Sequence, residues 1–110
     1  MTGAAALEPG NESLTLIEKL VGFDTTSHKP NLELIEFVRD YLSDLSVDSV
    51  LVEDETRNKA NLFATAGPEE EAGILLSGHT DVVTVKGQDW HSDPFWVTRR
   101  DDRLHGRGTA

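Results

Sequence analysis

The sequence predicts an α/β fold, and two observations carry this prediction. Apolar residues recur at helical spacing in two segments of the first half of the chain. Beyond residue 48 they give way to short apolar runs separated by polar turns, as in strands. Helices followed by short strands, with no internal repeat, are typical of a sheet covered by helices.

The chain opens with residues 1–10, which are rich in Ala, Gly and Pro and which we expect to form a flexible leader. The first helix is predicted at residues 11–22, ending at Gly22 because glycine favours helix ends. Its apolar face consists of Leu14, Ile17, Leu20 and Val21.

The second predicted helix, residues 31–45, has the clearest pattern. It follows Pro30, and Asn31 is a suitable N-cap. Its apolar residues fall on one face and its charged residues mostly off it, so we expect it to cover a sheet. The apolar face is made of Leu34, Ile35, Val38, Tyr41, Leu42 and Leu45.

Several strands are predicted after this helix. Short strands are expected at residues 49–52 and 61–66, and a hairpin around a turn at residues 100–102. Residues 74–77 begin with a wholly apolar run that Gly78 closes, and we predict a buried central strand there.

Composition excludes several classes of function. The 110 residues include 20 acidic and 10 basic ones, a formal net charge of -10, which argues against nucleic acid as a partner. There is no cysteine, so a metal would have to use imidazole and carboxylate ligands. The start lacks the basic region of a signal peptide, and no run approaches the ~20 apolar residues that span a bilayer. We therefore expect a cytoplasmic protein with no membrane partner.

The candidate site is a His-x-Asp pair, His79 and Asp81, directly after the predicted central strand. Ligands collect at the carboxyl ends of strands in open α/β sheets. One interpretation is a metal ligand with a carboxylate that orients its imidazole or assists proton transfer. The other is a buried structural histidine, with Asp81 capping a turn. The spacing alone favours the structural interpretation, because His-x-Asp is short and common.

The other candidates are weaker. His28, His91 and His105 have no partner at metal-ligand spacing, and we expect them to be structural or exposed. Ser77 is not in a Gly-x-Ser-x-Gly elbow, and Gly106 with Gly108 lacks the third glycine of a dinucleotide site. A catalytic zinc takes about three protein ligands, so either His79 is not a ligand or the others lie beyond the chain.

Three motifs together resemble a known family. They are Ser77-Gly78-His79-Thr80-Asp81-Val82-Val83, then Trp90 with Asp93-Pro94-Phe95, then Asp102-Arg103-Leu104-His105-Gly106-Arg107-Gly108-Thr109-Ala110. In this order and spacing they resemble the amino-terminal part of the zinc-dependent aminoacylase and carboxypeptidase family. From about Ser13 onward the chain is similar to this family, which includes acetylornithine deacetylase, succinyl-diaminopimelate desuccinylase and dipeptidases. The ending Gly-Thr-Ala favours the first of these.

The resemblance implies a fold and a site. Residues 11–110 would be the amino-terminal portion of a zinc-peptidase-like catalytic domain, two helices followed by a mixed sheet, truncated before completion and without its lid domain. His79 would bind one of two zinc ions, for which cobalt could substitute, and Asp81 would be the catalytic aspartate holding the His79 imidazole. An aspartate that bridges the two metals is expected immediately after Ala110.

The resemblance also implies an activity. The intact parent would hydrolyse the amide bond of a small N-acyl amino acid, converting N2-acetylornithine to ornithine and acetate in arginine biosynthesis, as a homodimer formed through the lid domain. Because the remaining ligands and the general base would lie downstream, we expect the 110-residue chain alone to be inactive.

Other functions stay open on the sequence. A desuccinylase or a dipeptidase-like relative would share these motifs, and a non-catalytic α/β module would use His79 and Asp81 structurally. Thr84 stands where the family commonly has proline, and His105 where it commonly has an aromatic residue. The codons after Ala110 discriminate: an in-frame Asp-Met-Lys-Gly supports the enzyme, and a genuine stop with no downstream remnant favours the module.

Overall fold

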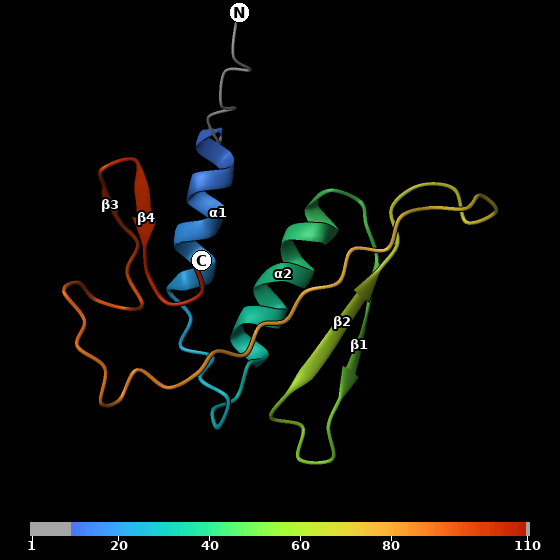
Figure 1. Ribbon diagram of the computed structural model, residues 1–110. Helices are drawn as coiled ribbons and strands as arrows, with labels where there is room; N and C mark the ends of the chain where they lie inside the picture. The colour runs from blue at the N-terminus through green and yellow to red at the C-terminus, as the bar shows by residue number, and fades with distance from the viewer. Residues whose placement is uncertain (1–9, 110) are drawn as a thin grey trace, which may run out of the picture. The chain divides into compact units, whose positions relative to one another are not determined.

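The computed structural model describes residues 10–109 and shows two helices and two small antiparallel hairpins (Figure 1), which confirms the α/β class. The described residues form two compact units: residues 10–23 with 87–109, and residues 24–86. Of the predicted leader, only Gly10 falls among the described residues.

The first unit contains helix α1, Asn11–Val21, and the hairpin of β3, Thr98–Arg100, with β4, Arg103–His105. The predicted first helix is confirmed, and Gly22 is its C-cap. The hairpin is confirmed as well. Asp101 and Asp102 form its two-residue turn with φ of 51° and 60°, a left-handed conformation that the short Asp side chain tolerates.

The second unit is organised around α2, Leu32–Asp44, and the hairpin of β1, Ser49–Glu53, with β2, Ala60–Ala64. The strands pair antiparallel from Ser49 opposite Ala64 to Glu53 opposite Ala60. As predicted, α2 lies along this hairpin and contacts both of its strands (Figure 1). Its apolar face supplies Leu34 and Ile35, which with Ala60 are the buried apolar residues of the described chain.

The hairpin of the second unit has two unlike faces. Leu51 and Leu62 are paired and half-buried, whereas the neighbouring pair of Val50 and Phe63 is exposed. Side chains alternate between the two faces of a strand, so these pairs lie on opposite sides. A single helix covers one face of this small sheet and leaves apolar side chains on the other.

The predicted central strand at residues 74–77 is wrong. Ile74, Leu75 and Leu76 belong to no strand and are 91%, 78% and 89% exposed. A strand needs the backbone groups of a neighbour, and within residues 10–109 none pairs with this segment. The expected mixed sheet is wrong for the same reason, since both described sheets are antiparallel pairs. Apolar composition predicted a strand, but pairing decides it.

The helices are short. α1 has 11 residues and α2 has 13, whereas a transmembrane helix takes ~20. In the described part of the chain, no helix has both the length and the apolar character to cross a membrane.

Candidate functional site

The structure brings His79 and Asp81 into contact. Nδ1 of His79 lies 2.9 Å from Oδ1 of Asp81 and 2.9 Å from the Asp81 backbone oxygen. Both side chains lie at the surface of the second unit, the imidazole 83% and the carboxylate 61% exposed. An imidazole this exposed is not the buried histidine of the structural interpretation.

This contact fixes which nitrogen of His79 carries hydrogen. A carboxylate oxygen and a carbonyl oxygen only accept hydrogen bonds, so Nδ1 must donate. In the neutral imidazole the lone pair is then on Nε2. Metal-binding histidines are held in this way, by a carboxylate or carbonyl on the nitrogen that does not bind the metal. The geometry therefore suits Nε2 of His79 as a metal donor.

The carboxylate of Asp81 is held by a second group. Ser27 Oγ donates to Asp81 Oδ2 over 3.3 Å and lies 3.2 Å from the Val82 backbone oxygen. The hydrogen bond from His79, and after it the one from Ser27, lowers the pKa of the Asp81 carboxyl. Asp81 is therefore ionised at neutral pH, which strengthens its hydrogen bond with the Nδ1–H of His79.

Thr80, between the pair, is fastened at two points. Thr25 Oγ1 donates to the Thr80 backbone oxygen at 2.5 Å, and Asn31 Nδ2 donates to Thr80 Oγ1 at 3.2 Å. Next along the chain, Val82 N donates to Thr25 O at 3.1 Å, within an isolated parallel bridge between Thr26 and Val82. These bonds hold residues 80–82 without a regular strand.

Residues 24–29 form the loop that carries Thr25 and Ser27. Thr25 and Thr26 are buried, and Thr26 Oγ1 donates to Asp24 Oδ1 at 2.6 Å. Asp24 also forms an ion pair with Lys29 across the loop. Burial raises the pKa of Asp24, but the hydrogen bonds from Lys29 and Thr26 and the charge of Lys29 together outweigh it and lower that pKa.

Asn31 lies at the N-cap position predicted for it, but its side chain does not cap α2. Instead, Asn31 Oδ1 accepts from Ala60 N at 2.9 Å, and Nδ2 donates to Ala60 O at 3.0 Å. The carboxamide thus pairs with the backbone at the start of β2 and reaches Thr80 from there.

Sequence reasoning missed Thr25, Ser27, Asn31 and Thr80 as residues that support the pair. Their bonds to residues 80 and 81 span 49 to 55 positions of the chain, beyond any local pattern. The signal available was compositional: a run of small hydroxyl residues in a polar loop, followed by an asparagine directly after proline.

The pair borders a cavity of about 610 Å³ in the second unit, between α2, the start of β2 and residues 77–81. The imidazole and carboxylate are the right kinds of group for a zinc site. Their number is too small, since the described residues contain no group of three or more His, Cys, Asp or Glu side chains that could hold a metal. The pair fits as part of a zinc site.

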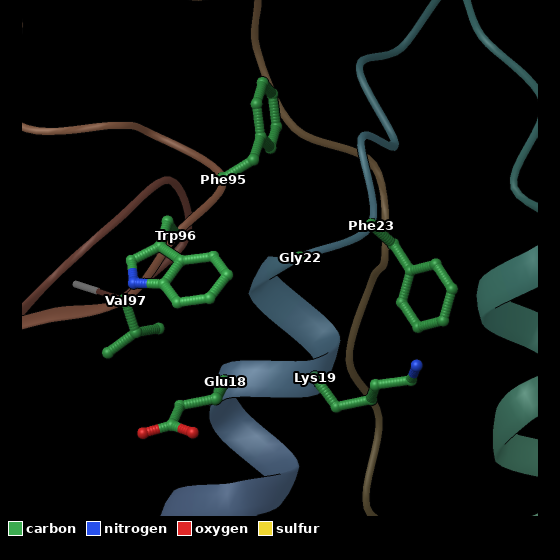
Figure 2. Close-up of a pocket in the computed structure, with 7 residues that line it drawn as sticks. All are labelled: Glu18, Lys19, Gly22, Phe23, Phe95, Trp96 and Val97. Atoms are coloured by element: carbon green, nitrogen blue, oxygen red, sulfur yellow. The ribbon is translucent and has the colours of Figure 1, made fainter.

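A second cavity, of about 310 Å³, lies in the first unit. Figure 2 shows it at the end of α1, where Lys19 extends toward Phe23 and Glu18 lies on the side of Trp96 and Val97. Lys19 Nζ stands 5.5 Å from the centre of the Phe23 ring, a cation–π contact. No histidine lines this cavity, and it contains no counterpart of the His79–Asp81 pair.

Comparison with known proteins relates part of the chain to part of a curated enzyme. No family model matches the chain. Over 81 residues it is 43% identical to the acetylornithine deacetylase of Pasteurella multocida (strain Pm70). The match covers 73% of this chain and 21% of the relative, so it spans about a fifth of that enzyme's length. The chain is thus similar to one segment of an enzyme named for amide hydrolysis.

The length of the match limits which residues of the chain it can contain. A continuous match of 81 residues within 110 must include the centre of the chain, from α2 to His79. The second unit, which holds the candidate site, therefore lies largely within the part that is similar to the deacetylase.

Proposed function

We propose that this chain forms the amino-terminal segment of a cytoplasmic, zinc-dependent amide hydrolase that converts N2-acetylornithine to ornithine and acetate in arginine biosynthesis. The observation that carries the proposal is the 43% identity over 81 residues to an acetylornithine deacetylase. The geometry of His79 and Asp81 is consistent with it, because the imidazole presents Nε2 and the carboxylate holds Nδ1.

In this proposal each side chain has a limited task. His79 would hold one of two zinc ions through Nε2, and Asp81 would keep the ring oriented and supply the negative charge that stabilises it. Ser27 would restrain the second oxygen of Asp81. The bound zinc would supply the usual chemistry of a hydrolytic metal, lowering the pKa of water and polarising the amide carbonyl.

In this proposal the chain supplies only part of the catalytic site. The remaining metal ligands, the general base and the surface for homodimer formation would come from sequence outside these 110 residues. A hydrolytic zinc site needs about three protein ligands, and the His79–Asp81 pair provides one ligand and its orienting carboxylate.

A chimera tests the proposal. The matched segment of this chain replaces its counterpart in the Pasteurella enzyme, and release of ornithine from N2-acetylornithine is measured with zinc or cobalt present. We expect turnover, and a loss of about 10–100-fold or more in the Asp81→Asn chimera, because Asp81 orients a metal ligand. Asp48→Asn, the same change at an exposed aspartate, is the matched control.

Substrate choice is tested in the same chimera and in the longest natural chain that contains this sequence. Turnover of succinyl-diaminopimelate or of a dipeptide in place of N2-acetylornithine would replace the deacetylase with one of the alternative hydrolases. A folded, zinc-loaded chimera that cleaves none of these substrates would contradict amide hydrolysis itself.

A further inference from the structure

We propose that Asn31 is a positioning residue of the His79–Asp81 pair and that it acts through Thr80. The inference rests on the proposed function, since the pair matters as a presented metal ligand. It assigns a task to a residue whose sequence context predicted only a helix cap.

The oxygen and both amino hydrogens of the Asn31 carboxamide have hydrogen-bond partners. Its oxygen accepts from Ala60 N at 2.9 Å, one amino hydrogen goes to Ala60 O at 3.0 Å, and the other goes to Thr80 Oγ1 at 3.2 Å. The first two bonds fix the plane of the amide against the backbone of Ala60, which is itself buried. The direction of the third bond is therefore set by β2.

Thr80 transmits this constraint to its two neighbours. His79 Nδ1 and Asp81 Oδ1 meet at 2.9 Å, so these two side chains lie on one side of the segment. Thr80 lies between them in the chain, and its hydroxyl oxygen accepts a hydrogen bond from Asn31. The backbone oxygen of Thr80 also accepts a hydrogen bond from Thr25 Oγ1. Rotation of Thr80 would therefore move His79 and Asp81 with it.

The constraint matters because little else holds the segment on the amino-terminal side of Thr80. Residues 74–76 are exposed and belong to no strand, while the bridge between Thr26 and Val82 holds the carboxyl-terminal side. Without the Asn31 bond, residues 77–80 keep fewer restraints, and Nδ1 of His79 no longer stays on Asp81.

The experiment uses the 110-residue chain and reads the two imidazole nitrogens of His79 by long-range ¹H–¹⁵N NMR, without metal. In the native chain we expect the hydrogen on Nδ1. Asn31→Ala should shift the population toward hydrogen on Nε2. Thr80→Val should do the same while leaving the Asn31–Ala60 pairing intact, so the result does not depend on whether Asn31→Ala still folds.

Zinc affinity is measured on the same variants. We expect Asn31→Ala and Thr80→Val each to weaken zinc binding about tenfold, as is typical for residues that support a metal ligand. The double variant should be no weaker than Asn31→Ala alone, because the bond that Thr80→Val removes is already absent there. Thr80→Ser, which keeps the hydroxyl, should behave like the native chain, and so should Asn11→Ala, which changes an exposed asparagine of the first unit.

The outcomes separate the inference from the proposed function. If His79 binds zinc but keeps its native hydrogen position and affinity in Asn31→Ala and Thr80→Val, the inference is overturned and the function stands. Additive losses in the double variant would overturn it too. If the hydrogen position shifts as expected but the native chain binds no zinc at His79, positioning by Asn31 is supported and the zinc proposal fails.

Discussion

Individual residues were predictable where their chemistry was distinctive. His79 and Asp81 could be chosen from the sequence because imidazole and carboxylate two positions apart are suited to metal and proton chemistry. The hydrogen-bonding partners that orient them could not. Asn31 looked like a cap, and its side chain bonds Ala60 and Thr80, which are 29 and 49 positions away.

At the residue scale, the Asp24–Lys29 pair predicts a pH dependence. The pKa of Asp24 is lowered in the folded chain, so the pair stabilises the loop of residues 24–29 above the ordinary Asp pKa of 3.8. That stabilisation is lost as the pH falls through the lower, folded-state pKa. The ¹³C shift of the Asp24 carboxyl should titrate with a midpoint below 3.8. Lys29→Met should move the midpoint upward; an unchanged midpoint would disprove the role of Lys29.

At the scale of elements, periodicity worked where local pattern and packing agree. Helical spacing predicted α1 and α2, short apolar runs predicted β1 and β2, and the turn at residues 100–102 predicted the β3–β4 hairpin. The two helices and the strands β1 and β2 lie within about two residues of their predicted bounds. Residues 74–77 failed because a run of apolar residues says nothing about whether a neighbouring strand is present. Strand formation depends on a pairing strand, and no described strand pairs with residues 74–77.

The packing of α2 on the hairpin makes an element-scale prediction. Leu34 is 6% exposed, whereas Leu45, just past the end of the helix, is 57% exposed. Leu34→Ala should lower the free energy of opening by at least about 2 kcal/mol, as a buried leucine truncation does, and Leu45→Ala by under about 1 kcal/mol. Hydrogen exchange of the β2 amides measures both. Equal losses would mean that the core is not where α2 meets β2.

At the scale of the whole molecule, the chain is small and poorly covered. Its described buried apolar residues are few, and it exposes Val50 and Phe63 on one hairpin face in addition to the segment of residues 74–76. The chain also spans about a fifth of the length of the deacetylase it resembles. Sequence motifs could indicate the relationship, but they could not show how the apolar surface is covered.

The exposed segment predicts self-association. Ile74, Leu75 and Leu76 form an apolar run whose backbone groups are not paired in a strand, and such segments associate with one another. Replacing all three by serine should lower the concentration-dependent light scattering of the purified chain. Replacing Glu69, Glu70 and Glu71 by serine is a nearby control that should not lower it. If the serine substitutions at residues 74–76 leave the scattering unchanged, another surface drives the association.

A further whole-molecule prediction concerns activity. The 110-residue chain alone should not hydrolyse N2-acetylornithine with zinc or cobalt present, because the pair supplies fewer ligands than a hydrolytic zinc needs. A sensitive ornithine assay checks this, with the Pasteurella enzyme as the positive control. Turnover that disappears in His79→Ala would show that the chain completes a site on its own.

We propose that His79 presents Nε2 to a metal while Asp81 holds Nδ1. The most direct measurement is a zinc titration of the ¹⁵N-labelled chain, following the ring nitrogens of all four histidines. We predict that zinc shifts Nε2 of His79 first, that Asp81→Asn weakens this response, and that His28, His91 and His105 respond later or not at all. Zinc binding through Nδ1 of His79, or preferentially at another histidine, would contradict this assignment of the metal ligand.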